Sequence, residues 1–237
     1  DRDHAFHAIE HDFGSDVLSV TAVDLLNDNW ANRSFGNLSA VKIGDLIVTP
    51  PWDRVSHEHT SDYLIEIDPS MGFGTGHHAS TRLMLKSLLE HKTDVQNSKH
   101  VLDIGTGSGV LAIASALLGA NTVTAVERDI DALTNARQNI NRNGVSTRIR
   151  AIHAELSELQ DFQLPTPDII LANLTGPAFQ KHQHLFETLG GPSGLLMISG
   201  LTESEEQTTL MAFESKFGFE SRHEEDGWIC LVFRYHC

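Results

Sequence analysis

From residue 100 to the C-terminus, short apolar runs alternate with longer stretches that have the apolar spacing of helices. This alternation constrains the fold more than any other feature, because parallel strands joined by crossover helices produce it. The sequence therefore predicts an α/β fold with a doubly wound, mostly parallel, seven-stranded sheet. Only a short hairpin separates the last two strand signals, which predicts an antiparallel end to the sheet. The expected strands are residues 100–104, 122–127, 148–154, 168–173, 194–200, 219–224 and 228–235, and the expected helices among them are 108–119, 131–144, 177–190 and 203–218.

The earlier residues are expected to form smaller units. Residues 1–29 hold seven acidic residues and one arginine, with little periodicity, and are predicted to be an acidic lead or a linker remnant. Residues 30–78 are predicted to be a small N-terminal β extension and a lid loop, with VKIGDLIVTPPW and DYLIEID as strands of an antiparallel layer. Residues 79–237 are predicted to be the main domain, beginning with a helix over 80–91 whose N-cap is Ser80.

The bulk properties narrow the classes of function. The chain has 237 residues and a formal net charge of -15, which argues against nucleic-acid or anionic-membrane binding and is compatible with a basic protein partner. No apolar run is long enough to cross a membrane, and the charged first residues lack the apolar core of a signal peptide, so we expect a cytoplasmic protein. Cys230 and Cys237 form neither a metal-type pair nor a disulfide framework. Because the chain does not begin with methionine, we expect that it has been processed or trimmed.

The stretch VLDIGTGSG, residues 101–109, lies where a predicted strand turns into a helix. Gly105, Gly107 and Gly109 would let the backbone turn sharply and approach a ligand, and the helix N-terminus offers unpaired N–H groups. Glu127 ends the next strand, where a carboxylate can accept both hydroxyl hydrogens of a ribose. The stretch therefore predicts a site for a nucleotide-like cofactor.

Two details of this loop favour S-adenosylmethionine as the cofactor. The spacing is G-x-G-x-G rather than the G-x-G-x-x-G of a dinucleotide site, and no G-K-[ST] of a phosphate-binding loop follows. Asp103 would repel a pyrophosphate but attract the cationic amine of S-adenosylmethionine. The alternatives are a tight structural turn and, for Asp103 and Glu127, acids that only serve a helix N-terminus or the surface.

A second glycine-rich stretch, MGFGTGHHAST at residues 71–81, precedes the main sheet. We expect it to fold over the cofactor as a lid, with Thr81 hydrogen-bonded to the cofactor. A metal site is the rival interpretation, but adjacent histidines rarely share one ion and no cysteine or acid cluster completes a site, so no metal is expected. Loop packing and capping are the other interpretation of the histidine pair. The residues expected to contact substrate or form the lid are Phe73, Gly74, Thr75, His77 and His78.

Together, these motifs resemble those of the PrmA family, the ribosomal large-subunit protein eleven methyltransferases. The motifs are DPSMGFGTGHHASTRLML, VLDIGTGSGVLAIASALLGA, VERDIDALTNARQNINRNG and DIILANL, and the resemblance covers roughly residues 25–237. It implies a Rossmann-like class I methyltransferase fold in residues 79–237, with S-adenosylmethionine as the methyl donor. It also implies lysine side chains and an N-terminal amine of a protein as acceptors. The cofactor contacts that it implies are Thr81, Gly105, Glu127 and Asn173.

The sequence departs from the family pattern at several positions. The family usually reads T-H-P-T-T where this chain has H-H-A-S-T at residues 77–81, and it more often has aspartate at the position of Glu127. Family members also carry a small α/β domain in front that recognises the ribosomal protein, and this chain is expected to lack room for it. The resemblance therefore predicts the chemistry more firmly than the substrate.

The predicted function is S-adenosylmethionine-dependent transfer of methyl groups to protein amines, most simply those of a basic ribosomal large-subunit protein. Asn173 ends a strand at the ligand-binding edge of the sheet and is the expected catalytic residue that holds the amine, the alternative being a plain turn residue. Trp228 is interpreted as a packed aromatic at the sheet edge. The alternative functions are a small-molecule methyltransferase on the same fold and a non-catalytic cofactor-binding protein. Direct nucleic-acid chemistry is disfavoured, because NLTG lacks the aromatic of a base-methylating motif.

Overall fold

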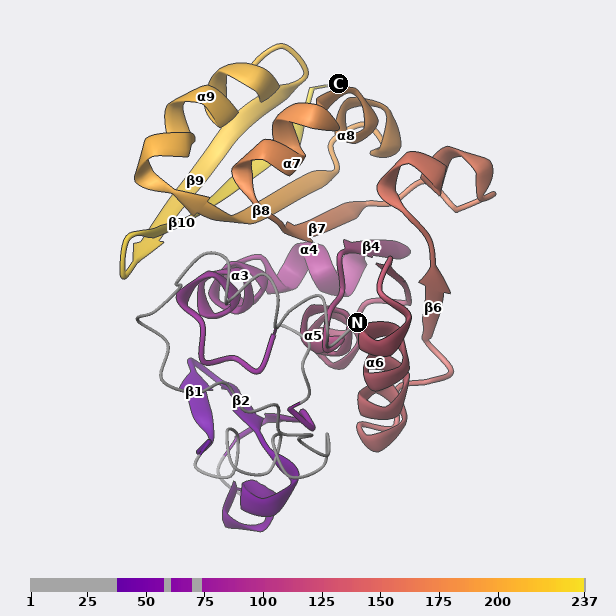
Figure 1. The fold of residues 1–237 in the computed structure, drawn as a ribbon, viewed down its shortest axis with the longest axis vertical. Coiled ribbons are helices and arrows are strands. Elements are labelled where there is room, and N and C mark those ends of the chain that lie inside the picture. Colours follow the sequence, from indigo (N-terminus) through magenta and orange to yellow (C-terminus); the bar gives the residue numbers. More distant parts are fainter. Residues whose placement is uncertain (1–37, 58–60, 70–73, 237) are drawn as a thin grey trace, which may run out of the picture. The chain divides into compact units, whose positions relative to one another are not determined.

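A seven-stranded sheet with the strand order β6-β5-β4-β7-β8-β10-β9 forms the centre of the fold (Figure 1). The computed structural model describes residues 38–57, 61–69 and 74–236. Strands β6, β5, β4, β7 and β8 are parallel, whereas β10 is antiparallel to both β8 and β9. The predicted α/β fold, its seven-stranded sheet and its antiparallel end are therefore confirmed. The strands are β4 (His100–Ile104), β5 (Thr122–Glu127), β6 (Ile149–His153), β7 (Ile169–Asn173), β8 (Leu195–Thr202), β9 (Phe217–Glu225) and β10 (Trp228–Tyr235).

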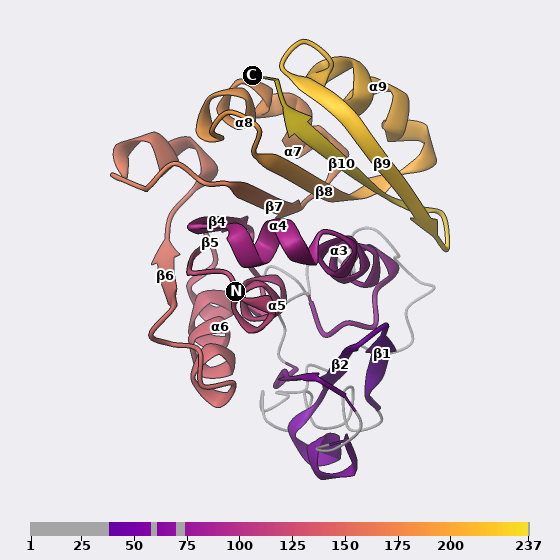
Figure 2. The ribbon, with the colours of Figure 1, turned by 180° about the vertical axis from the view of Figure 1, so that it is seen from behind.

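Helices cover both faces of the sheet, as Figures 1 and 2 show. Helices α3 to α6 lie on one face and α7 to α9 on the other. Because successive side chains of a strand point to opposite faces, β4 contributes Val101 to the core on the α5 side and Leu102 to the core on the α9 side. The helices are α3 (Ala79–Glu90), α4 (Lys92–Asn97), α5 (Val110–Leu118), α6 (Ile130–Arg142), α7 (Gly176–Lys181), α8 (Gln183–Leu189) and α9 (Glu203–Phe213).

A small second sheet, made of β1 (Val41–Ile43), β2 (Leu46–Thr49) and β3 (Tyr63–Glu66), precedes the main one. The β1–β2 pair is antiparallel, but β2 and β3 are parallel, so the prediction of an antiparallel layer is wrong for that pair. The register explains the difference: Tyr63 lies beside Leu46, so the chain returns from the end of β2 to the level of its beginning. A short helical segment, η2 (Pro51–His57), forms part of that return. Apolar alternation alone does not report strand direction.

Two local predictions about helices are also corrected. The N-cap of α3 is His78, whose Nδ1 accepts a hydrogen bond from Ser80 N, so Ser80 lies inside the helix. The expected helix over 177–190 is two helices, α7 and α8, because the backbone of His182 leaves the helical region between them. Three features of the sequence analysis, the acidic lead at 1–29, Phe73 and Cys237, lie outside the described residues.

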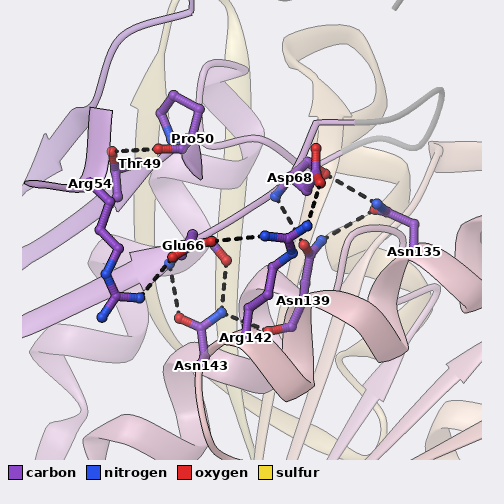
Figure 3. A network of polar contacts seen from close by, with 9 residues as sticks. All are labelled: Thr49, Pro50, Arg54, Glu66, Asp68, Asn135, Asn139, Arg142 and Asn143. Carbon is purple, nitrogen blue, oxygen red and sulfur yellow. Dashed lines mark hydrogen bonds and ion pairs between the residues drawn. The ribbon is translucent and has the colours of Figure 1, made fainter. Parts of the chain in front are cut away.

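Polar side chains of α6 join the small sheet to the main domain (Figure 3). Asn143 pairs with both backbone groups of Glu66: Asn143 Nδ2 donates to Glu66 O (2.7 Å), and Glu66 N donates to Asn143 Oδ1 (2.9 Å). The Glu66 carboxylate accepts hydrogen bonds from Arg54 (2.7 Å) and Arg142 (3.2 Å), and Arg142 also binds Asp68 (2.9 Å). The amide of Asn143 therefore supplies β3 with the hydrogen bonds that a neighbouring strand would otherwise make.

We expect Asn143→Ala to lower the free energy of unfolding by roughly 1–3 kcal/mol, because it leaves two backbone groups of Glu66 without their partner. Urea denaturation of the variant and the parent protein measures this difference. Asn141→Ala, at an exposed position of the same helix, is the matched control and should change stability far less. Equal effects of the two substitutions would contradict the role given to Asn143.

Candidate cofactor and acceptor site

A cavity of about 720 Å³ opens at the carboxyl ends of β4, β5 and β7. Ligands bind at this edge in open α/β sheets, where neighbouring crossovers diverge. Its wall is built from the β4–α5 loop, the ends of β5 and β7, the start of α3 and the start of β10. Of the cofactor, substrate and lid residues predicted from the sequence, those on the wall are Gly74, His78, Thr81, Gly105, Gly107, Glu127 and Asn173.

The β4–α5 loop turns tightly against the end of β7. Gly105 has a φ of +71°, and a Cβ built on it would lie 2.7 Å from the side chain of Leu174. Any larger residue would therefore clash with Leu174 as well as strain the backbone. The backbone N–H groups of Gly105 and Thr106 both donate to Val126 O at 2.9 Å, which ties the turn to β5. Gly109 is not on the cavity wall and instead packs near Ala136 of α6.

Asp103 holds the β4–α5 loop from the side of the protein core. Its side chain is completely buried, and its Oδ2 accepts hydrogen bonds from Thr106 Oγ1 (2.6 Å) and Ala112 N (3.1 Å). No donor among the described residues reaches Oδ1. Burial raises the pKa of Asp103 to about 7. The structure thus places Asp103 beneath the loop and not on the cavity wall, where sequence reasoning expected it to meet the cofactor directly.

Glu127 holds the same loop from the side of the cavity. Its Oε2 accepts a hydrogen bond from Gly107 N (3.0 Å), and its Oε1 accepts from the backbone N–H groups of Arg128 (3.0 Å) and Asp129 (3.1 Å). These contacts fix the carboxylate on the cavity wall at the end of β5. Because each carboxylate oxygen has two lone pairs, Oε2 retains capacity to accept a ligand hydroxyl.

The first glycine-rich stretch lies directly against the second. Ser108 Oγ donates to Gly74 O at 2.7 Å. Asn139, which is fully buried on α6, donates to Ser108 O and accepts from Asp68 N, both at 2.9 Å. Asp68 and Gly74 are therefore both tied, through Asn139 and Ser108, to the loop that carries Gly105 and Gly107. This contact places the two stretches in one site.

The histidine pair divides between two roles. His77 Nδ1 lies 3.3 Å from Thr75 Oγ1 and 3.2 Å from Thr75 O, and neither residue is on the cavity wall. His78 does lie on the wall, caps α3 and packs edge-on against the ring of Trp228, with 4.5 Å between the ring centroids. Burial, followed by the nearby charge of Arg82, lowers the pKa of His78 below its ordinary value, which favours the neutral ring.

Asn173 and Thr81 meet across the cavity wall. Asn173 Nδ2 lies 3.4 Å from Thr81 Oγ1, which joins the end of β7 to the first turn of α3. Gly200, in β8, makes room for this arrangement, because a Cβ there would lie 2.3 Å from Leu174 O and 3.0 Å from Asn173 Oδ1. The amide of Asn173 is thus held between two elements at the ligand-binding edge.

Trp228 and Gly200 are wall residues that sequence reasoning missed or interpreted only as packing. Trp228 is half-buried and follows the D-G turn that starts β10. That turn was a visible signal for a hairpin, but nothing local shows that the hairpin returns to the N-terminus of α3. Gly200 reads as an ordinary glycine at the end of a strand.

Within residues 38–57, 61–69 and 74–236, no three histidine, cysteine, aspartate or glutamate side chains are grouped so that they could hold a metal ion. Among the same residues, no helix is both long and apolar enough to span a membrane.

The order of the strands and the cavity at the edge of the sheet are those of a class I methyltransferase. The crystal structure of the ribosomal protein L11 methylase from Lactobacillus delbrueckii subsp. bulgaricus matches with a TM-score of 0.74 and 25% identity, covering 84% of this chain and 100% of that chain. The family model described as "Ribosomal protein L11 methyltransferase (PrmA)" matches residues 3–236. The chain therefore belongs to the ribosomal protein L11 methyltransferase family, as its motifs predicted.

Relatives of this name align along most of the chain. The protein from Carboxydothermus hydrogenoformans is 35% identical over 87% of this chain and 66% of its own length. The protein from Syntrophotalea carbinolica is 33% identical over 93% of this chain and 71% of its own length. The chain thus spans about two thirds of the length of these relatives. The family match also begins before residue 25, where the motifs alone placed the start of the resemblance.

We expect Asp103→Asn to change the pH dependence of stability in a definite direction. Unfolded aspartate titrates near 4, whereas the folded pKa of Asp103 is about 7, so the folded protein binds the proton more tightly. The contribution of Asp103 to stability is therefore greatest below pH 4 and falls as the pH rises through 7. Asparagine keeps an acceptor for Thr106 and Ala112 but does not ionise. Relative to the parent, the variant should gain roughly 2 kcal/mol between pH 5 and pH 8.

Urea denaturation at several pH values measures this difference. Asp161→Asn, at an exposed position, is the control and should follow the parent protein. Parallel pH profiles for Asp103→Asn and the parent would show that burial does not perturb this carboxyl group.

Proposed function

We propose that this protein is an S-adenosylmethionine-dependent methyltransferase that methylates lysine side chains or the N-terminal amine of ribosomal protein L11. The observation that carries the proposal is the convergence of Gly105, Gly107, Glu127 and Asn173 on one cavity, in a member of this family. The names of the relatives supply the acceptor protein. The chemistry is argued from the residues of the cavity.

The residues of the cavity fit S-adenosylmethionine. The volume is in the range of sites for ligands of this size. The tight turn at Gly105 brings backbone close to the ligand, and Glu127 can accept a ribose hydroxyl on Oε2. The Asp103 carboxyl group, one layer beneath, can favour a cationic amine through space without touching it. When bound, the cofactor supplies a methyl group on a sulfonium, which needs no further activation.

The protein's own residues then position the acceptor and exclude water. Asn173, held between Thr81 and Gly200, presents an amide oxygen that can accept a hydrogen bond from the incoming amine and so orient its lone pair. The indole of Trp228 offers an apolar wall that also attracts a cationic side chain. The neutral ring of His78 does not repel that charge.

His78 is a poor candidate for the base that removes the amine proton. Its Nδ1 already accepts a hydrogen bond from Ser80 N, so in the neutral ring the proton sits on Nε2. The amine proton therefore passes to water before attack, and the role of the site is placement. A net charge of -15 supports a basic protein acceptor over a nucleic acid, and a ribosomal acceptor supports a cytoplasmic location.

The test is methyl transfer by the purified chain from tritiated S-adenosylmethionine to purified ribosomal protein L11. We expect label in the ribosomal protein, and we expect Asn173→Ala to lower kcat by roughly a hundredfold because the acceptor loses its orientation. Asn141→Ala is the matched control and should retain the parent rate. Intact mass of the product gives the number of methyl groups.

Other outcomes separate the alternatives. Label that appears only in other proteins or in small molecules of an extract would reject ribosomal protein L11 as the acceptor while keeping the chemistry. Cofactor binding without transfer to any acceptor would support a non-catalytic cofactor-binding protein.

A further inference from the structure

The guanidinium of Arg82 connects three parts of the chain that meet beside the cavity. From the first turns of α3, Arg82 Nε donates to Glu225 Oε1 (2.6 Å) and Nη2 donates to Asp226 Oδ2 (3.1 Å). Its Nη1 donates to the backbone carbonyl of His77. One side chain thus binds the tip of the β9–β10 hairpin and the backbone just ahead of the α3 cap.

The hairpin tip determines where Trp228 lies. Asp226 and Gly227 have φ values of 51° and 76°, and Glu225 pairs directly with Trp228, so the turn is a tight two-residue turn. Trp228 is the first residue after it. Its ring reaches the cavity wall and packs against His78, the residue that follows His77. Arg82 therefore acts on both residues of the Trp228–His78 wall through their neighbours in the sequence. It binds the turn that precedes Trp228 and the backbone carbonyl of the residue before His78.

The ion pairs themselves are weak sources of stability. The side chains of Glu225 and Asp226 are 40% and 74% exposed, and exposed pairs contribute little because water and salt screen them. What the arginine adds is geometry, since its planar fork fixes the direction of several hydrogen bonds at once. Lysine, with one ammonium group, does not reproduce this fork.

The same hairpin contains a matched arginine that lacks the connection to the cavity. Arg222 of β9 pairs with Glu206 of α9 (2.6 Å) and Glu224 (2.8 Å). It resembles Arg82 in binding two carboxylates at a partly exposed position. Neither Arg222 nor the two carboxylates that it binds lie on the cavity wall.

We infer that Arg82 is a positioning residue for the acceptor side of the site: it sets the Trp228–His78 wall against which the acceptor side chain is placed. This inference rests on the proposed function, in which that wall receives the acceptor. It leaves the cofactor side, built from Gly105, Gly107 and Glu127, independent of Arg82.

The first test is steady-state methylation of ribosomal protein L11 by Arg82→Ala, Arg82→Lys and Arg222→Ala. Arg82→Ala should raise KM for the acceptor by roughly tenfold, because the wall is no longer fixed. The dissociation constant of S-adenosylhomocysteine, measured by calorimetry, should stay within about twofold of the parent value. Arg82→Lys should recover only part of the loss, and Arg222→Ala should keep the parent KM. Equal KM values for Arg82→Ala and Arg222→Ala, or a matching loss of cofactor affinity in Arg82→Ala, would overturn the inference.

A second readout does not depend on activity and so separates this inference from the proposed function. In a background of Trp30→Phe and Trp52→Phe, Trp228 is the single tryptophan. Arg82→Ala should shift its fluorescence emission to longer wavelength and increase acrylamide quenching, whereas Arg222→Ala should not. A parent protein that methylates nothing but shows this difference would reject the acceptor role and keep the positioning of Trp228 by Arg82. Unchanged Trp228 fluorescence in Arg82→Ala would reject the positioning itself.

Discussion

The shape of the site depends on two carboxylates that accept hydrogen bonds from the β4–α5 loop. Asp103 binds the β4–α5 loop from the core through Thr106 and Ala112, and Glu127 binds it from the cavity through Gly107. Burial destabilises the ionised form of Asp103 and so raises its pKa, and the nearby charge of Glu127 raises that pKa further. The hydrogen bonds of the two carboxylates together hold the loop in one shape. A preshaped loop of this kind lowers the ordering cost of binding.

Other parts of the chain are arranged around that loop. Ser108 and Asn139 tie it to Gly74 and Asp68. Arg142 of α6 also binds Asp68 and Glu66, the last residue of β3 in the small sheet (Figure 3). The α6 helix therefore supports the cofactor side of the cavity on one flank and the residues leading to α3 on the other. The wall that we propose receives the acceptor is built separately, from the start of α3 and the start of β10.

Much of the main domain could be predicted from the sequence, because strand, turn and helix signals there agree with one another. Each expected strand from residue 100 onward is present, and the short hairpin between the last two strand signals correctly predicts the antiparallel end. The wrong predictions arise where the local sequence pattern gives no strand direction, or where tertiary contacts override that pattern. The parallel pairing of β2 and β3 is set by the path between them. The break at His182 is a change of backbone conformation that helical periodicity does not report.

Prediction of the site from the sequence is limited in the same way. Motif spacing locates the residues at the edge of the sheet, and the cavity wall contains seven of the cofactor, substrate and lid residues predicted from the sequence. It does not reveal that Asp103 faces the loop from the core, because a motif does not tell which side of a turn a side chain occupies. Nor does it place Trp228 beside His78, since the two residues are 150 positions apart in the chain and meet only through the fold.

The most direct measurement is calorimetric titration of the purified chain with S-adenosylmethionine, comparing the parent with Glu127→Ala and with the control Glu214→Ala on an exposed surface. The account predicts one site per chain in the parent and the control, and affinity at least roughly tenfold weaker in Glu127→Ala, with its folded state retained by circular dichroism. Equal affinity in all three proteins would contradict the claim that the loop held by Asp103 and Glu127 forms the cofactor site.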